Sequence, residues 1–119
     1  MRRSLLGFTV AAGLLTGSGM AAAAGFGFLA ETPMGRFNAD DLKLMNGAID
    51  QALAAAEPGT PVRWANEQTA SSGEVTLQRA FENSGRPCRD LRVVNRHRRL
   101  EAAGVYTMCR EDGQWTLAQ

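Results

Sequence analysis

The residues best suited to chemistry in this chain gather in its last third. Both cysteines, Cys88 and Cys109, lie there with the only histidine, His97, and the only tyrosine, Tyr106. Six arginines fall within residues 86–99 of the same stretch, against a single acidic residue. Guanidinium groups bind phosphates and carboxylates through paired hydrogen bonds, and cysteines form disulfides or bind metals. The types of residue therefore indicate a covalent crosslink next to a surface suited to anions.

Strand periodicity decides which arginines can act together. On a regular strand Arg92, Arg96 and Arg98 share one face, whereas Arg89 and Arg99 lie on the other. A face with three arginines could hold an anionic ligand through its phosphates or carboxylates. The alternative is a solvated outer face whose charge is neutralised from neighbouring strands. The acidic residues available for that are Glu74, Glu82 and Glu101.

No arrangement of residues predicts catalysis. A general base needs a nucleophile and an orienting group, and His97 is surrounded in sequence only by arginines, so we interpret it as a turn residue. The serines Ser71, Ser72 and Ser84 lie in turn-forming sequence without the G-x-S-x-G context of a nucleophile. The sequence also lacks a phosphate-binding loop and a metal-spaced cluster. We predict a protein that is not an enzyme and needs no cofactor or metal.

The N-terminus has the features of a signal peptide. Two arginines follow Met1, an uncharged apolar stretch covers residues 5–20, and small residues at 22–24 predict cleavage after Ala24. The alternative, a retained membrane anchor, is disfavoured because a span needs about 20 mostly apolar residues. Cleavage takes the basic count from 13 to 11 against 12 acidic residues, so the exported chain is nearly neutral. This balance argues against a nucleic-acid partner.

An exported chain with two cysteines favours one disulfide, Cys88–Cys109, because the extracytoplasmic compartments are oxidising. Two free thiols are the alternative, and a metal site is disfavoured because two cysteines and one histidine fall short of the usual four ligands. If the cysteines lie opposite each other in a hairpin, every other cross-strand pair is fixed. The pairs that follow are Leu91 with Tyr106, Arg92 with Val105, and Arg96 with Glu101.

An amphipathic helix is predicted from residue 38 to about residue 56. Asn38 is a suitable N-cap, two aspartates follow in the first turn, and Phe37 precedes the cap where it can pack on Leu42. Pro58 and the glycine after it end the helix. The residues that recur at helical spacing and should face the core are Leu42, Met45, Ile49, Ala52 and Leu53.

A period of two replaces the helical period after residue 60. Strands are predicted at 61–66, 74–81, 86–97, 101–110 and 114–118, with turns at 69–73, 83–85, 98–99 and 112–113. The fold class is α+β: one N-terminal amphipathic helix packed on a five-stranded antiparallel meander sheet, with one disulfide. The face that the helix covers should carry Trp64, Val75, Leu77, Phe81 and Trp115.

The domain organisation is a signal peptide at 1–24, an extended arm at 25–37 and a single α+β domain at 38–119. The arm is expected to lay three large apolar residues on the core, because such residues favour packing over disorder. These residues are Phe26, Phe28 and Leu29.

A set of short motifs runs along the chain from about residue 25 to its end. They are Thr32-Pro33-Met34, Asp41-Leu42-Lys43-Leu44-Met45, Trp64-Ala65-Asn66, Ser72-Gly73, Gly85-Arg86-Pro87-Cys88-Arg89, Gly104-Val105-Tyr106, Cys109-Arg110 and Asp112-Gly113-Gln114-Trp115. The most specific are the Cys-Arg doublet, used twice, and the Asp-Gly-x-Trp ending. Together these residues resemble the C-terminal domain of small proteobacterial outer-membrane surface antigens, the 17 kDa surface antigen family. Unlike its best-known members, this chain lacks a lipoprotein cysteine after the signal peptide and a long glycine-zipper segment.

The resemblance implies an exported envelope protein associated with the outer membrane, with no family catalytic residues to transfer. Two functions from different classes follow. The first is a non-enzymatic structural or interaction protein of the envelope, held peripherally at the outer membrane by residues 25–29 or by partners. The second is a soluble periplasmic binding or inhibitor module that holds an anionic ligand or partner on Arg92, Arg96 and Arg98. In the envelope such a ligand could be a lipopolysaccharide phosphate, an anionic phospholipid or an acidic glycan.

Overall fold

The computed structural model describes residues 32–118 of the chain. A short 3-10 helix, η1 (Met34–Arg36), precedes the longer helix α2 (Ala39–Leu53). The strands that follow are β1 (Val62–Asn66), β2 (Ser71–Asn83), β3 (Arg86–His97), β4 (Leu100–Glu111) and β5 (Gln114–Leu117). The predicted signal peptide and the part of the predicted arm at 25–31 lie outside the described residues.

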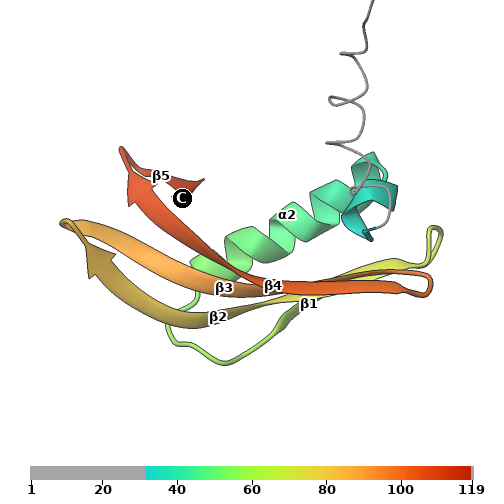
Figure 1. Cartoon of the computed structure of the whole chain (residues 1–119), viewed down its shortest axis with the longest axis horizontal. Coiled ribbons are helices and arrows are strands. Elements are labelled where there is room, and N and C mark those ends of the chain that lie inside the picture. The colour runs from blue at the N-terminus through green and yellow to red at the C-terminus, as the bar shows by residue number, and fades with distance from the viewer. Residues whose placement is uncertain (1–31, 119) are drawn as a thin grey trace, which may run out of the picture.

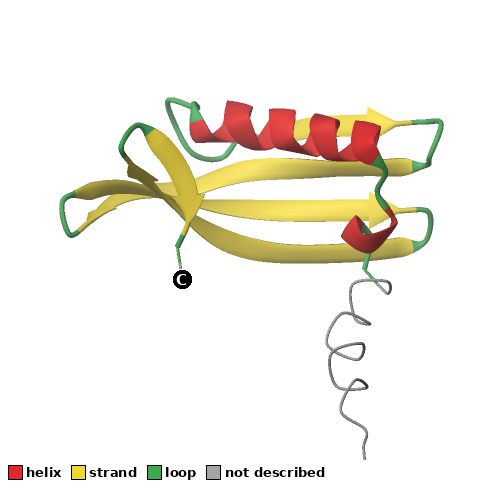
Figure 2. Ribbon diagram, turned by 90° about the horizontal axis from the view of Figure 1, so that it is seen from above, coloured by secondary structure: helices red, strands yellow, loops and turns green. Residues whose placement is uncertain are grey.

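The strands form one antiparallel sheet in the order β1-β2-β3-β4-β5, so each strand pairs with its neighbour in the chain. The sheet curls, and α2 lies along its concave side (Figure 1). Seen from above, α2 runs over the β1 and β2 side of the sheet, while η1 packs near β3 (Figure 2). The predicted α+β architecture is confirmed, with one face of an antiparallel sheet covered by a helix.

The central hairpin has the predicted register. Cys88 lies opposite Cys109 and is joined to it by a disulfide. The neighbouring turns also lie where the sequence placed them, and Gly85 and Gly113 adopt positive φ angles of 77° and 79°, as two-residue hairpin turns require. The three other predicted pairs are present: Leu91 with Tyr106, Arg92 with Val105, and Arg96 with Glu101.

Asn38 caps α2 as predicted. Its side chain accepts a hydrogen bond from the Asp41 N–H at 2.8 Å, while the Asp41 carboxylate accepts one from the Asn38 N–H at 3.0 Å. This reciprocal pair is a capping box with aspartate in the third position. The helix ends at Leu53, three residues before the predicted end. There the Arg89 guanidinium binds the backbone carbonyls of Leu53 and Ala55, so a further helical turn is not needed to satisfy them.

The apolar stripe of α2 differs from the prediction at its first turn. Leu42 remains 37 % exposed, and Phe37 packs edge-on against Trp64 with ring centroids 5.2 Å apart. The fully buried side chain of the first turn is that of Asp41, whose carboxylate accepts the hydrogen bonds described below. The buried core consists of Met45, Ala48, Ala52 and Leu53 of the helix with Trp64, Val75, Leu77, Leu91 and Val93 of the sheet, and Ile49 and Trp115 pack against it.

The predicted loop at residues 69–73 is wrong beyond Ala70. The structure places Ser71 and the two residues after it in β2, and the turn lies just before them. Serine and glycine are typical of turns, but Ser71 is buried because its hydroxyl hydrogen bonds to the Asp41 carboxylate. A long-range contact therefore overrides the local preference.

The predicted position of Phe81 on the core face is also wrong. A β-bulge lies between Leu77 and Arg79 of β2. Leu77 lies opposite Leu91 on the concave side, but beyond the bulge Phe81 lies opposite Cys88 on the convex side. One extra residue reverses the alternation of a strand, and the Arg79 guanidinium covers the Phe81 ring at 4.1 Å from its centroid.

Gly73 is the position of β2 where the backbone and a core ring come closest. A Cβ at this residue would lie 2.4 Å from the Val94 carbonyl oxygen and 2.6 Å from Trp64 Nε1. Gly73→Ala should therefore lower the free energy of unfolding by about 1–3 kcal/mol, since backbone and indole must both move. Urea denaturation of the purified protein measures the change.

Gly47→Ala is the matched control, because it adds the same methyl group in the middle of α2. A Cβ there meets no atom within 4 Å. Alanine at an open helical position should stabilise the protein by about 0.5–1 kcal/mol. Equal effects of the two substitutions would show that the close approach at Gly73 does not limit packing.

Candidate interaction surfaces

The three arginines predicted to form an anion site lie along β3 and its turn. Arg92 is exposed and has Thr76 and Val105 as its cross-strand neighbours, so no acidic residue lies directly opposite it. Arg98 is exposed in the turn, with a positive φ of 54°. Six residues of extended chain separate Arg92 and Arg98 by roughly 20 Å, too far for both to bind one phosphate.

Arg96, between them, is neutralised within the sheet. Its Nε lies 2.6 Å from Glu101 Oε1 on β4, and its Nη2 lies 3.4 Å from Glu74 Oε1 on β2. Glu74 also lies 3.3 Å from Arg63 on β1, so charges alternate across four strands. The hydrogen bond that Arg96 donates to Glu101, and then the smaller effects of the charge of Glu101 and of Glu74, raise the pKa of Arg96 despite its partial burial. The structure thus favours the solvated, neutralised face at this arginine.

A second charged cluster lies on the convex side near the disulfide. The Asp90 carboxylate accepts hydrogen bonds from Thr107 Oγ1 at 2.5 Å and from Arg79 Nε at 2.6 Å. These bonds, Thr107 first, lower the pKa of Asp90 despite its partial burial. Arg79 is therefore occupied by an acid and an aromatic ring rather than available to a ligand.

Arg89 lies on the concave side, as strand alternation predicted. Its Nη1 donates to the backbone oxygens of Leu53 at 2.8 Å and Ala55 at 2.7 Å. The guanidinium also lies 5.9 Å from the centroid of the Trp115 ring. A cation at the C-terminus of a helix satisfies free carbonyls and interacts favourably with the helix dipole. This arginine ties β3 to α2 and so has a structural role.

A buried polar cluster lies where the N-terminus of α2 meets the sheet. Asp41 Oδ1 accepts hydrogen bonds from Asn66 Nδ2 at 2.8 Å and Thr69 Oγ1 at 2.7 Å, and Oδ2 accepts one from Ser71 Oγ at 3.1 Å. Ser71 Oγ lies 2.8 Å from His97 Nδ1. Because a carboxylate only accepts, the serine hydroxyl donates to Asp41 and leaves His97 Nδ1–H to donate to the serine.

The cluster contains an aspartate, a serine and a histidine, yet its geometry does not suit catalysis. Ser71 lies between the other two and is 1 % exposed, so its oxygen cannot reach a substrate. Burial alone would raise the pKa of Asp41, but the hydrogen bonds from the Asn38 N–H, Thr69, Asn66 and Ser71 outweigh it and lower the pKa. His97 ends β3 rather than forming the turn, which corrects its predicted place. We interpret the cluster as a structural tie between helix and sheet.

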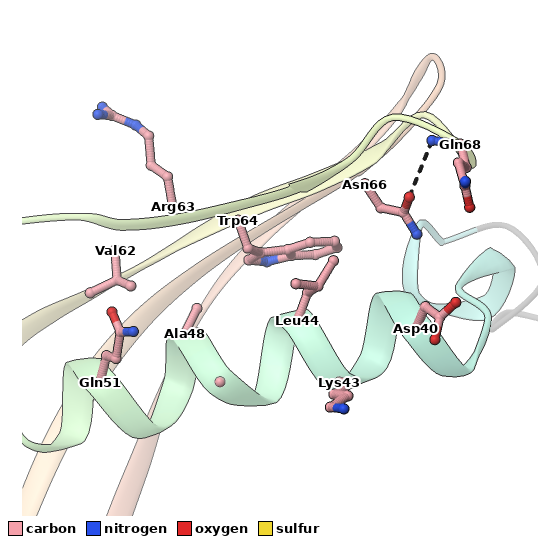
Figure 3. A pocket seen from close by; sticks show the side chains of 11 residues that line it. Asp40, Lys43, Leu44, Ala48, Gln51, Val62, Arg63, Trp64, Asn66 and Gln68 are labelled. Carbon is pink, nitrogen blue, oxygen red and sulfur yellow. Dashed lines mark hydrogen bonds between the residues drawn. The ribbon is translucent and has the colours of Figure 1, made fainter.

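A shallow groove separates α2 from the edge strand β1 (Figure 3). Its volume is about 590 Å³, and its lining includes Leu44 and Gly47 of the helix and Trp64 of the strand. In the close view the Trp64 ring extends over the helix near Leu44, whereas Arg63 points away on the other side of β1 (Figure 3). Asn66 Oδ1 accepts a hydrogen bond from the Gln68 N–H at 3.1 Å at one end. These residues supply no nucleophile and base in contact.

Two negative findings apply to residues 32–118. None of the helices there has the length and apolar character needed to cross a bilayer. Within the same range, histidine, cysteine and acidic side chains do not form a group of three that could hold a metal ion.

Comparison with known proteins assigns the family. The sequence profile of the 17 kDa outer membrane surface antigen family matches residues 51–116, more than half of the chain. The chain belongs to this family. The match starts in the last turn of α2 and runs into β5, so the disulfide hairpin and the charged convex face of the sheet lie inside it.

Two curated relatives are each named "17 kDa surface antigen", from Rickettsia bellii strain RML369-C and from Rickettsia bellii. Each is 37 % identical over 81 residues, covering 65 % of this chain and 50 % of the relative. The chain thus spans about half the length of the curated 17 kDa surface antigens it matches. No solved structure matches it.

Sequence reasoning missed the roles of Asp41, Gly73 and Arg89. A signal was present for the first, because Asn38 followed by an acid three residues later is typical of a capping box. No local signal marks Gly73, whose constraint comes from a ring and a carbonyl on two other strands. The partners of Arg89 lie more than 30 residues away in sequence, at the end of the helix.

Proposed function

We propose that this chain is a non-enzymatic, exported protein of the cell envelope, with a structural or interaction role like that of an outer-membrane surface antigen. The observation that carries the proposal is the family match, which spans the strands and the disulfide-linked hairpin. A disulfide suits a chain that folds outside the cytoplasm. The family is one of surface antigens rather than a known enzyme family.

The described surface supports an interaction role. The convex side of the sheet is not covered by α2 and carries charged side chains in cross-strand pairs. Exposed antiparallel faces commonly carry such pairs, which keep a small domain soluble while offering a patterned surface to a partner. Asp41, Asp90 and Arg89 make hydrogen bonds that tie elements of the fold together, and this structural use supports a role without catalysis.

Cell fractionation tests the proposal. The native protein should be found outside the cytoplasm and should co-sediment with the outer membrane. A high-salt wash then separates modes of attachment, because salt screens charge interactions but strengthens apolar ones. Protein found in the cytoplasm would contradict the proposal. Protein in the soluble periplasm would favour the alternative role described next.

The alternative function is that of a periplasmic binding module for anions, and one observation favours it. Arg92 is exposed, with no acid opposite it, in a face where Arg63, Arg79 and Arg96 each pair with an acid. An anionic ligand would therefore use Arg92, with Arg98 further along the hairpin, rather than all three arginines predicted.

Arg92→Glu should reduce retention on vesicles that contain anionic phospholipid by several-fold at low salt, because each basic residue near such a surface contributes about 1 kcal/mol. A salt series with co-sedimentation measures the effect. Lys43→Glu makes the same change of charge on the exposed face of α2 and should leave retention unchanged. Equal retention of both variants and the wild type would exclude the anion-binding role of this face.

A further inference from the structure

The first half of β4 forms an open edge of the sheet as residues 32–118 define it. The strand β5 covers only the second half of β4 and ends where the Ala118 N–H donates to the Thr107 oxygen. The backbone groups of Thr107 therefore point away from β3, and by alternation those of every second residue before it do the same. The residues that present their N–H and C=O groups in this way are Glu101, Ala103 and Val105.

This open edge lacks the features that usually prevent strands from pairing. Natural edges carry lysine, proline, a bulge or an inward-pointing charge. Residues 100–106 contain neither lysine nor proline, and their register with β3 is continuous. The opposite edge, β1, is better protected, because Pro61 precedes it, Arg63 is exposed and α2 packs beside it. The β4 edge is therefore the one suited to strand addition.

Large apolar side chains beside the open edge remain exposed on both faces of the sheet. Val105 on the convex side is 54 % exposed, and Tyr106 on the concave side is 48 % exposed. On the concave side a groove of about 490 Å³ is lined in part by the small residues Ala102 and Gly104. An added strand would remove this apolar surface from water.

The edge is complementary to a second copy of itself. Two identical strands can pair antiparallel about a twofold axis. With the axis at Ala103, that residue pairs with its own copy and Glu101 pairs with Val105, so the outward groups of all three are used. A shift of the register brings in either Thr107, which already bonds to Ala118, or a residue of the turn before β4. The register centred on Ala103 is therefore favoured.

Charge favours the same register. On the convex side Arg92 lies opposite Thr76 and Val105, so no acid lies directly opposite it. In the centred register the partner's Glu101 lies beyond Val105, two strands from Arg92 and about 10 Å away between Cα atoms. The long side chains of arginine and glutamate can together span that distance. Within one copy, Glu74 already bridges arginines on two strands.

We propose that two copies of this chain pair through their β4 edges into one continuous antiparallel sheet. Backbone hydrogen bonds at residues 101, 103 and 105 supply affinity. On the convex side Arg92 pairs with the partner's Glu101, and on the concave side Tyr106 packs against the partner's Leu100. The inference goes beyond the envelope function, and neither depends on the other.

Sedimentation velocity on the purified exported protein tests the proposal. The wild type should change from monomer to dimer over about a hundredfold range of concentration, because association follows mass action. Ala103→Pro removes an N–H that points outward rather than one that bonds to β3, so the fold should persist while the dimer is lost. Far-UV circular dichroism and the urea midpoint check the fold. A wild type that stays monomeric, or a dimer that persists in the proline variant, would overturn the proposal.

Charge reversal tests the register without altering the backbone. Arg92→Glu brings two glutamates together across the interface and should weaken the dimer at least about tenfold at low salt. Lys43→Glu makes the same change of charge on the exposed face of α2 and should leave the dissociation constant unchanged. Equal dissociation constants for the two variants would rule out the register centred on Ala103.

Amide hydrogen exchange by NMR identifies the surface that pairs. The amides of Ala103 and Val105 should exchange at least about tenfold more slowly in the dimer than in diluted monomer, while those of β3 keep the same protection. Equal exchange at both concentrations would contradict the proposal, because the dimer would then use another surface. Slow exchange already in the monomer would also contradict it, because the edge would then be paired within one chain.

Discussion

Asp41→Ala should destabilise this protein by roughly 3–5 kcal/mol, a large fraction of the stability of a small domain. The carboxylate is fully buried and accepts hydrogen bonds from the Asn38 N–H and from the side chains of Asn66, Thr69 and Ser71. Removing it leaves several donors without a partner in a water-poor site. Urea denaturation followed by tryptophan fluorescence measures the loss.

Two further measurements distinguish the buried network from a simple charge effect. Asp40→Ala removes the neighbouring exposed acid of the same helical turn and should cost only about 0.3–1 kcal/mol through the helix dipole. A similar loss in both variants would contradict the network.

The pH dependence of stability provides the second measurement. Because the folded-state pKa of Asp41 lies below its ordinary value of 3.8, its contribution is fully present above pH 3.8 and is lost as pH falls through the lowered pKa. The wild type should therefore lose stability on acidification below about pH 4 more steeply than Asp41→Asn. Parallel curves would show that Asp41 is not held as the ionised form.

Loss of the disulfide should have an effect of similar size. Cys88 and Cys109 are 21 residues apart, and in the loop-entropy model a crosslink of this span contributes about 3 kcal/mol. Both residues are 1 % exposed, so the double variant Cys88→Ala/Cys109→Ala avoids placing serine hydroxyls in a buried site. Its unfolding midpoint in urea should fall accordingly.

The hairpin itself should survive, because the ion pair of Arg96 with Glu101 and the rest of the register remain. Wild-type protein kept reduced with dithiothreitol is the matched control and should unfold at the same urea concentration as the variant. Alkylation of the exported protein without reductant, followed by mass spectrometry, should label neither cysteine. Labelling of both would show that the disulfide does not form in the cell.

Much of the fold follows from short-range sequence signals. Period-two alternation, the tight-turn signals at Gly85 and Gly113 and the assumption that the cysteines face each other fixed the register of β3 and β4. Asn38 marked the start of α2. Each of these signals involves residues in one turn or in two strands joined by a short turn. Such local signals leave the chain few alternative conformations.

The features that sequence patterns did not predict depend on contacts and register that form only in the folded sheet. The bulge after Leu77 moved Phe81 to the convex face, and neither residue type nor alternation reports a single inserted position. Ser71 was assigned to a loop by its residue type, yet it lies in β2, where its hydroxyl donates a hydrogen bond to Asp41, 30 residues away in sequence. For Arg96 the sequence left two alternatives open, an anion site or a neutralised face, and only the folded sheet shows the glutamates that pair with it on both neighbouring strands.

The sequence by itself determined the class of this protein: an α+β chain with a capped helix, a five-stranded meander, a disulfide-linked hairpin and the motifs of a surface antigen family. Only the tertiary structure decided which charged residues are free. Whether an arginine binds a ligand, a helix end or a glutamate depends on side chains that meet across strands, at distances of a few ångströms, after the sheet has curled. Those contacts are set by register, bulges and the docking of α2, and no local pattern encodes them.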